Sequence, residues 1–209
     1  MFGNLQDFFT STTGITITVL LIITILFFIL RGGKNDDKRN NTKVLTISAL
    51  LIALAMVLGE IKIFQMPQGG SITLLSMLPI VFCGYLFGVR RGVMAGICVG
   101  LLNLIFGPYI IHPLQMLLDY PIAFGAMGLA GLSKKSLTKG YLIGISGRFV
   151  CAVISGIVFF GEYAPEGFNA VSWSIWYNLT YISIEAVITI IIINIKPVKN
   201  ALERLKNSI

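Results

Sequence analysis

The sequence predicts an all-α protein, a polytopic membrane helix bundle with a six-helix core and one extra N-terminal transmembrane helix. Hydrophobic residues make up 56% of the chain and charged residues only 12%, whereas soluble domains carry about 25% charged residues. Apolar runs recur along the chain, and the basic residues gather in short clusters between them. A chain of this composition needs lipid as its solvent. Its net charge of +7 therefore indicates membrane topology and not nucleic-acid binding.

Seven apolar runs are long enough, or nearly so, to cross a hydrocarbon layer of about 30 Å as helices. Each must be helical, because backbone groups in lipid need hydrogen-bond partners within the segment. We expect spans at Ile15–Leu30, Leu45–Ile61, Ile72–Phe87, Gly92–Phe106, Leu114–Leu132, Tyr141–Phe160 and Val171–Ile195.

Basic residues fall on every second loop, which is the pattern of cytoplasmic loops. The opposite loops carry acidic residues and only one lysine, Lys62. With seven spans, this alternation predicts a multi-pass protein of the cell membrane with its N-terminus outside and its C-terminus in the cytoplasm. Fourteen of the sixteen basic residues follow the rule: Arg31, Lys34, Lys38, Arg39, Lys43, Arg90, Arg91, Lys134, Lys135, Lys139, Lys196, Lys199, Arg204 and Lys206.

A hydrophilic, Asn-rich linker, Gly32 to Thr42, separates the first apolar run from the others. The run resembles a cleaved signal peptide in length, but it lacks a basic segment before it and a small-residue cleavage site after it. We therefore interpret residues 1–42 as an uncleaved anchor helix with its linker, and residues 43–209 as a substrate-binding membrane domain.

Three ionisable residues, Asp119, Arg148 and Glu185, lie inside expected spans. Charged groups in a membrane are costly and usually functional. One interpretation is a buried ion pair of Arg148 with either carboxylate. The other makes Asp119 the anion that receives a cationic or amino-bearing ligand, and both can hold at once.

Aromatic residues gather at the outer helix ends, as in an interfacial belt, but Tyr120 adjoins Asp119, and Trp173 and Asn178 open the last span. Aromatic faces beside a carboxylate suit a flat cationic ligand. The Gly69–Gly70 pair in the outer loop 66–71 permits either a tight turn or a lid over a ligand, and the outer loop 161–167 allows the same alternatives.

Small residues recur at Ala49 and Ala53 of the second run. Such a stripe lets another helix approach closely, either within the bundle or on a partner subunit.

No sequence motif indicates an enzyme or a cofactor. The chain has no GxxxxGK[ST] phosphate-binding loop, no GxGD motif, and only one histidine, His112. No cluster has metal-ligand spacing, and the three cysteines sit in apolar runs, so no disulfide framework is indicated.

Several long motifs, in order, resemble the thiamine-specific substrate-binding (S) components of energy-coupling factor (ECF) vitamin transporters. The resemblance covers the six-helix core and rests on MPQGGSITLLSMLPI (66–80), LFGVRRG (86–92), QMLLDYPIAFGAMGLAG (115–131), GRFVCAVISGIVFFGEYAPEG (147–167) and SWSIWYN (172–178).

The resemblance implies high-affinity uptake of thiamine through a pocket near the outer surface. It also implies partners: a membrane coupling protein, which the Ala49 and Ala53 stripe would dock, and two ATPase subunits. Carried over by position, the pocket residues are Asp119, Tyr120, Tyr109, Gly156, Phe160, Trp173 and Asn178.

The chain departs from the family pattern at three places. Ala152 stands where a pocket histidine is common, Phe160 stands where some members have tryptophan, and the loop near Gly70 lacks a tryptophan found in others. These departures keep open an S component for another small vitamin or precursor.

Overall fold

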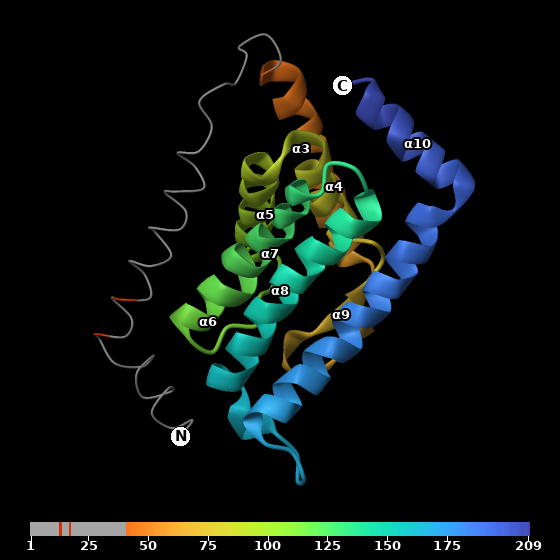
Figure 1. Ribbon diagram of the computed structural model, residues 1–209. Helices are drawn as coiled ribbons and strands as arrows, with labels where there is room; N and C mark the ends of the chain where they lie inside the picture. Colours follow the sequence, from red (N-terminus) through yellow and green to blue (C-terminus); the bar gives the residue numbers. More distant parts are fainter. Residues whose placement is uncertain (1–12, 14–16, 18–40) are drawn as a thin grey trace.

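The computed structural model describes residues 13, 17 and 41–209 (Figure 1). The first expected span, Ile15–Leu30, and its linker to residue 40 lie outside the described residues, apart from isolated position 17. The rest is a helical membrane bundle, which confirms the predicted fold class.

The remaining expected spans appear as helices, with shifted ends and two breaks. Among the described residues, three helices are long and apolar enough to cross a membrane: Thr42–Glu60 within α3, Leu137–Phe159 and Ala170–Asn194. The full helices are α3 (Asn41–Glu60), α4 (Met77–Phe87), α5 (Val89–Asn103), α6 (Pro113–Leu117), α7 (Ala123–Ala126), α8 (Leu137–Phe159), α9 (Ala170–Asn194) and α10 (Lys196–Asn207).

The prediction of a helix at Ile72–Phe87 is wrong for residues 72–76, which precede the helix. Strand β1 (Lys62–Gln65) pairs antiparallel with β2 (Ser71–Thr73), and the short 3₁₀ turn η2 (Pro67–Gly69) joins them. Helix α4 begins only at Met77, after Leu75 adopts a positive φ of 60°. The loop 66–71, which we expect on the outside, is thus the tip of a β-hairpin.

The expected span at Leu114–Leu132 is helical but not one regular helix. Between α6 and α7 the chain makes a π-helical turn, η3 (Leu118–Ile122), and it ends in the 3₁₀ segment η4 (Met127–Leu132). Pro121 lies inside this turn and cannot donate a backbone hydrogen bond, which favours an irregular turn. π-turns within helices are frequent at functional sites, and this one carries Asp119 and Tyr120.

The core forms where α8 packs along α9 and where η4 packs against α4, α5 and α8. Glycine allows the closest approach. A Cβ at Gly128 would lie 2.0 Å from the backbone nitrogen of Val93, and one at Gly100 would lie 2.5 Å from the Tyr120 carbonyl oxygen. The broken helix is therefore fixed against α5 without intervening side chains.

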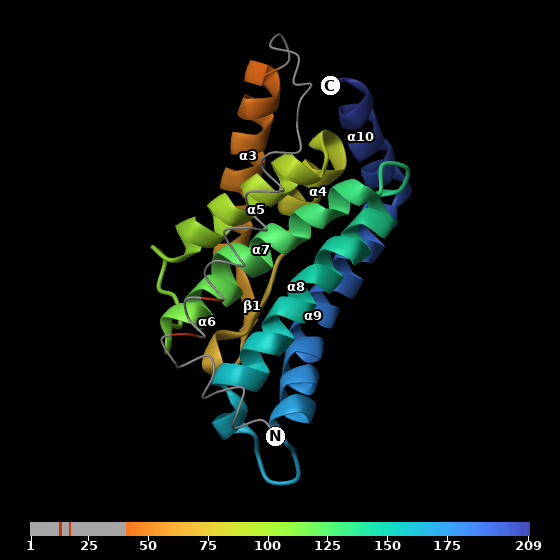
Figure 2. The ribbon, with the colours of Figure 1, turned by 60° about the vertical axis from the view of Figure 1, so that its left-hand side comes forward.

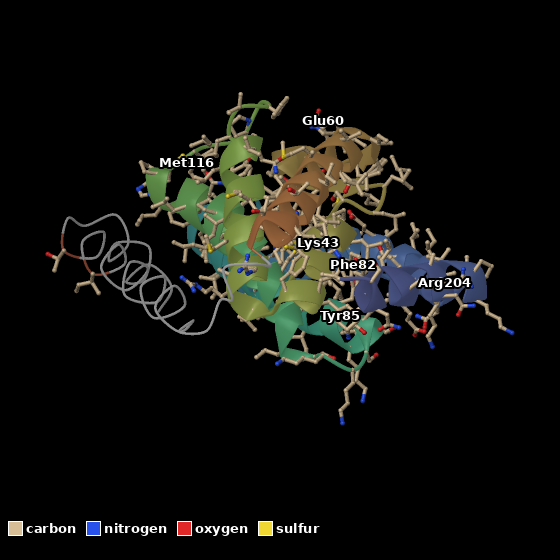
Figure 3. The ribbon with its side chains drawn as sticks, turned by 90° about the horizontal axis from the view of Figure 1, so that it is seen from above. Lys43, Glu60, Phe82, Tyr85, Met116 and Arg204 are labelled. Carbon is tan, nitrogen blue, oxygen red and sulfur yellow. The ribbon has the colours of Figure 1, made fainter. Side chains whose placement is uncertain are left out.

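The basic loops gather at one end of the bundle, where α3 begins and α10 ends (Figures 1 and 2). Lys43 donates a hydrogen bond of 2.8 Å to the Ser208 carbonyl, and the Lys206 ammonium lies 3.9 Å from the centre of the Tyr85 ring. Figure 3 looks onto this end and shows Arg204 on α10, away from the centre. The β-hairpin, the start of α6 and the end of α8 lie at the opposite end.

Candidate functional site

A cavity of about 460 Å³ lies beside the hairpin. Small-molecule sites commonly enclose about 300–1,000 Å³. Its walls come from the end of α3, the hairpin, α5 and the loop after it, the broken helix, α8 and α9. All seven residues expected from the sequence line it: Tyr109, Asp119, Tyr120, Gly156, Phe160, Trp173 and Asn178.

The Asp119 carboxylate is held on the π-turn by its neighbour one helical turn earlier. Gln115 Nε2 donates a 2.6 Å hydrogen bond to Asp119 Oδ2. The same nitrogen donates to the Tyr109 carbonyl at 3.1 Å. The Tyr120 hydroxyl accepts a 2.8 Å bond from the Tyr109 N–H. The π-turn and the loop before α6 therefore support each other around the carboxylate.

Two further polar groups face this part of the cavity. Ser155 is only 1% exposed, and its hydroxyl lies near the Asp119 carboxylate without a geometrically sound hydrogen bond to any described group. The Arg148 guanidinium stacks 4.6 Å from the centre of the Phe124 ring. A buried hydroxyl without a partner is costly, and a bound ligand is one way of supplying that partner.

Two groups of aromatic residues line the cavity. Tyr109 and Phe160 approach with ring centres 6.0 Å apart. On α9, Trp173 lies 5.8 Å from Tyr177, which in turn lies 5.7 Å from Tyr181. Flat faces next to a carboxylate offer both stacking and cation–π attraction to a planar cationic ligand.

Gly156 and Asn178 bring α8 and α9 together behind the cavity. A Cβ at Gly156 would lie 2.1 Å from the Ser174 hydroxyl oxygen, so only glycine fits there. The Asn178 amide donates to the Ala152 carbonyl at 3.2 Å and accepts from the Tyr181 hydroxyl at 2.9 Å. Asn178 thus lines the cavity while its amide group is used to join the two helices.

Comparison with known proteins gives the family. The family model described as "Thiamine transporter protein" matches residues 45–204. The chain belongs to this family. The match confirms the resemblance seen in the motifs, and it places the chain among transport proteins, not enzymes.

The chain is also similar in sequence and structure to individual members of the thiamine transporter family. The chain is 37% identical to the thiamine transporter ThiT of Bacillus subtilis over 152 residues, which is 64% of this chain and 79% of that protein. It is 31% identical to ThiT of Lacticaseibacillus paracasei over 139 residues, 57% and 69% of the two chains. The solved structure of ThiT from Listeria monocytogenes superposes with a TM-score of 0.63 at 26% identity, over 76% of this chain and 97% of that one.

The ion pair considered from the sequence does not form between the described residues of this transporter. Glu185 instead accepts hydrogen bonds from Thr73, Ser76 and Met77, at 2.7 to 3.3 Å. The hypothesis that Glu185 pairs with Arg148 is wrong. The junction between the hairpin and α4 supplies the hydrogen-bond donors for its carboxylate, because the chain turns there and directs N–H and hydroxyl groups toward Glu185.

The cavity residues that were not predicted as site residues include Gln115, Ser155 and Tyr177. Gln115 stands four residues before Asp119, a spacing that puts both on one helix face, and this signal could have found it. The Tyr177 hydroxyl accepts from the Gly70 N–H at 2.9 Å and donates to the Pro67 carbonyl. It ties the hairpin tip to α9, a contact that no local pattern indicates.

Ala49 and Ala53 are exposed on α3, on a side of the helix that also exposes Leu45, Leu50 and Val57. The small-residue stripe is therefore not used for packing within the described bundle. Its residues are exposed at the surface of the described bundle.

Proposed function

We propose that the chain binds thiamine from the outside and delivers it as the S component of an ATP-driven ECF-type transporter. The observation that carries the proposal is the position of Asp119, on a π-turn that lines a cavity together with aromatic rings. The relatives from Bacillus subtilis and Lacticaseibacillus paracasei are named thiamine transporters, which supports thiamine as the ligand.

The chemistry of the ligand fits the polar groups of the cavity. Thiamine joins an aminopyrimidine ring to a thiazolium ring that carries a positive charge. An ionised Asp119 accepts hydrogen bonds from an amino group and offsets nearby positive charge. Trp173, Tyr120 and Phe160 supply faces on which planar rings stack.

Energy for uptake would come from other subunits, because the sequence holds no phosphate-binding loop. The exposed Ala49–Ala53 stripe of α3 is the surface that we assign to the coupling protein, since small residues let two helix backbones approach closely. We place the basic end of the bundle in the cytoplasm and the cavity outside, following the distribution of lysine and arginine.

Ala152 favours a second candidate function, that of an S component for another small vitamin or precursor. The side chain is a methyl group where the family pattern commonly has a pocket histidine. Mass spectrometry of the ligand that copurifies with the protein distinguishes the two. Thiamine supports the first candidate, and a different vitamin with no thiamine binding in a calorimetric titration supports the second.

A further inference from the structure

The amide group of Gln115 forms three hydrogen bonds within the protein, although the residue lines the cavity. It is 1% exposed. Its Nε2 donates to Asp119 Oδ2 at 2.6 Å and to the Tyr109 carbonyl at 3.1 Å, and its Oε1 accepts from the Ile111 N–H at 3.1 Å. Rotating the amide by 180° would set Oε1 against two acceptor oxygens and the NH₂ group against an N–H donor. The contacts therefore fix the orientation of the amide.

This orientation assigns different roles to the two oxygens of Asp119. Oδ2 is occupied by the bond from Gln115. Among the described residues, the Ser155 hydroxyl also lies near this carboxylate, but it makes no hydrogen bond of sound geometry, so Oδ1 is not held in the way that Oδ2 is. A carboxylate held by one oxygen loses its freedom to rotate, and its other oxygen keeps one direction. Oδ1 is then the atom left for a donor on the ligand.

We propose that Gln115 is a positioning residue for ligand recognition, which holds Asp119 so that a single oxygen is presented to the amino group of the ligand. The inference rests on the proposed function, because it takes Asp119 as the acceptor of that group.

The loop at Tyr109, whose carbonyl accepts a hydrogen bond from Gln115, is itself held in place by other contacts. The Tyr109 N–H donates to the Tyr120 hydroxyl at 2.8 Å, so the backbone that receives the Gln115 amide is tied to the same π-turn. A Cβ at Gly69 would lie 2.9 Å from the Tyr109 Cβ, so the hairpin tip also packs on this loop. Gln115 cannot swing away from Asp119 without breaking these bonds.

Selectivity between two ligands separates positioning from a merely structural role. We would measure dissociation constants for thiamine and for its analogue with a carbonyl in place of the pyrimidine amino group, in the wild type and in Gln115→Met. Methionine keeps the length and volume of the side chain but removes all three hydrogen bonds. A matched control is Asn194→Leu, which removes an amide bonded to Ile190 and Thr138 far from the cavity.

We expect Gln115→Met to reduce the preference for thiamine over the analogue by roughly tenfold, and Asn194→Leu to leave that preference unchanged. Equal weakening of both ligands, or an unchanged preference, would overturn the proposal. Thermal melting identifies a variant that fails to fold, and Gln115→Asn, which keeps an amide but is one methylene shorter, then takes its place. A wild type that binds neither ligand would instead contradict the proposed function.

Discussion

Glu185 on α9 accepts two hydrogen bonds from Thr73 of the hairpin, one from its N–H at 3.2 Å and one from its hydroxyl at 2.7 Å. Two more donors, the Ser76 hydroxyl and the Met77 N–H, reach its other oxygen. The carboxylate is 3% exposed. One buried group therefore fixes the place where the hairpin ends and α4 begins.

We expect Glu185→Gln to lower the free energy of unfolding by about 3 kcal/mol, because its NH₂ group would face two donors in place of an acceptor oxygen. Ligand affinity should change far less than in a variant of Asp119. Denaturant or thermal unfolding in detergent measures the first effect, with Glu166→Gln on an exposed outer loop as the control. Equal stability of the two variants would show that the Glu185 contacts contribute little.

Hydropathy predicted the helices well and the hairpin poorly, for a physical reason. Lipid forces every spanning segment to satisfy its own backbone groups, so an apolar run alone predicts a helix. The run that starts at Ile72 is apolar, but Glu185, more than a hundred residues later, supplies acceptors that let the chain leave the helical pattern at Thr73 and Ser76. Tertiary contacts of this kind leave no periodic signal in the sequence.

Ser155→Ala should weaken thiamine binding several-fold without lowering stability. The Ser155 hydroxyl is buried beside Asp119 but makes no hydrogen bond of sound geometry among the described groups, so we expect its removal to cost the folded protein little. In the complex, the same hydroxyl is available to a ring nitrogen or amino group. Calorimetry and thermal melting on the same preparation test both halves. A loss of stability with unchanged affinity would show that Ser155 serves the fold.

Bulky residues at Ala49 or Ala53 should abolish uptake while binding stays intact. Both alanines are exposed on α3, and added volume there prevents the close approach of a partner helix. Transport of labelled thiamine by cells that express Ala49→Trp tests this, with Ile191→Trp on the exposed face of α9 as a control for added bulk. Normal uptake by Ala49→Trp would mean that the docking surface lies elsewhere.

The orientation in the membrane can be tested by labelling single cysteines, after replacement of Cys83, Cys98 and Cys151. A membrane-impermeant maleimide added to intact cells should label Pro165→Cys, in the outer loop before α9, and should not label Lys135→Cys, between η4 and α8. Both positions are exposed. Labelling of Lys135→Cys alone would reverse the orientation.

The candidate site was predictable only in part. Asp119 stood out because a carboxylate within an apolar span is costly, and the aromatic residues followed from the motifs around it. Gln115 is marked only by its spacing of four residues before Asp119, and Ser155 is an uncharged residue in ordinary helical sequence that nothing local distinguishes from a packing residue. Their roles depend on which atoms meet across α6, α8 and the loop at Tyr109, and that information exists only in three dimensions.

The most direct test is the affinity of the purified, folded Asp119→Asn variant for thiamine. Asparagine keeps the shape of the side chain and an oxygen that accepts the bond from Gln115, but it removes the negative charge. Charge-assisted hydrogen bonds contribute about 1.5–3 kcal/mol, so the dissociation constant measured by calorimetry should rise roughly ten- to a hundredfold. Unchanged affinity in a variant that melts like the wild type would contradict the assignment of Asp119 to the ligand.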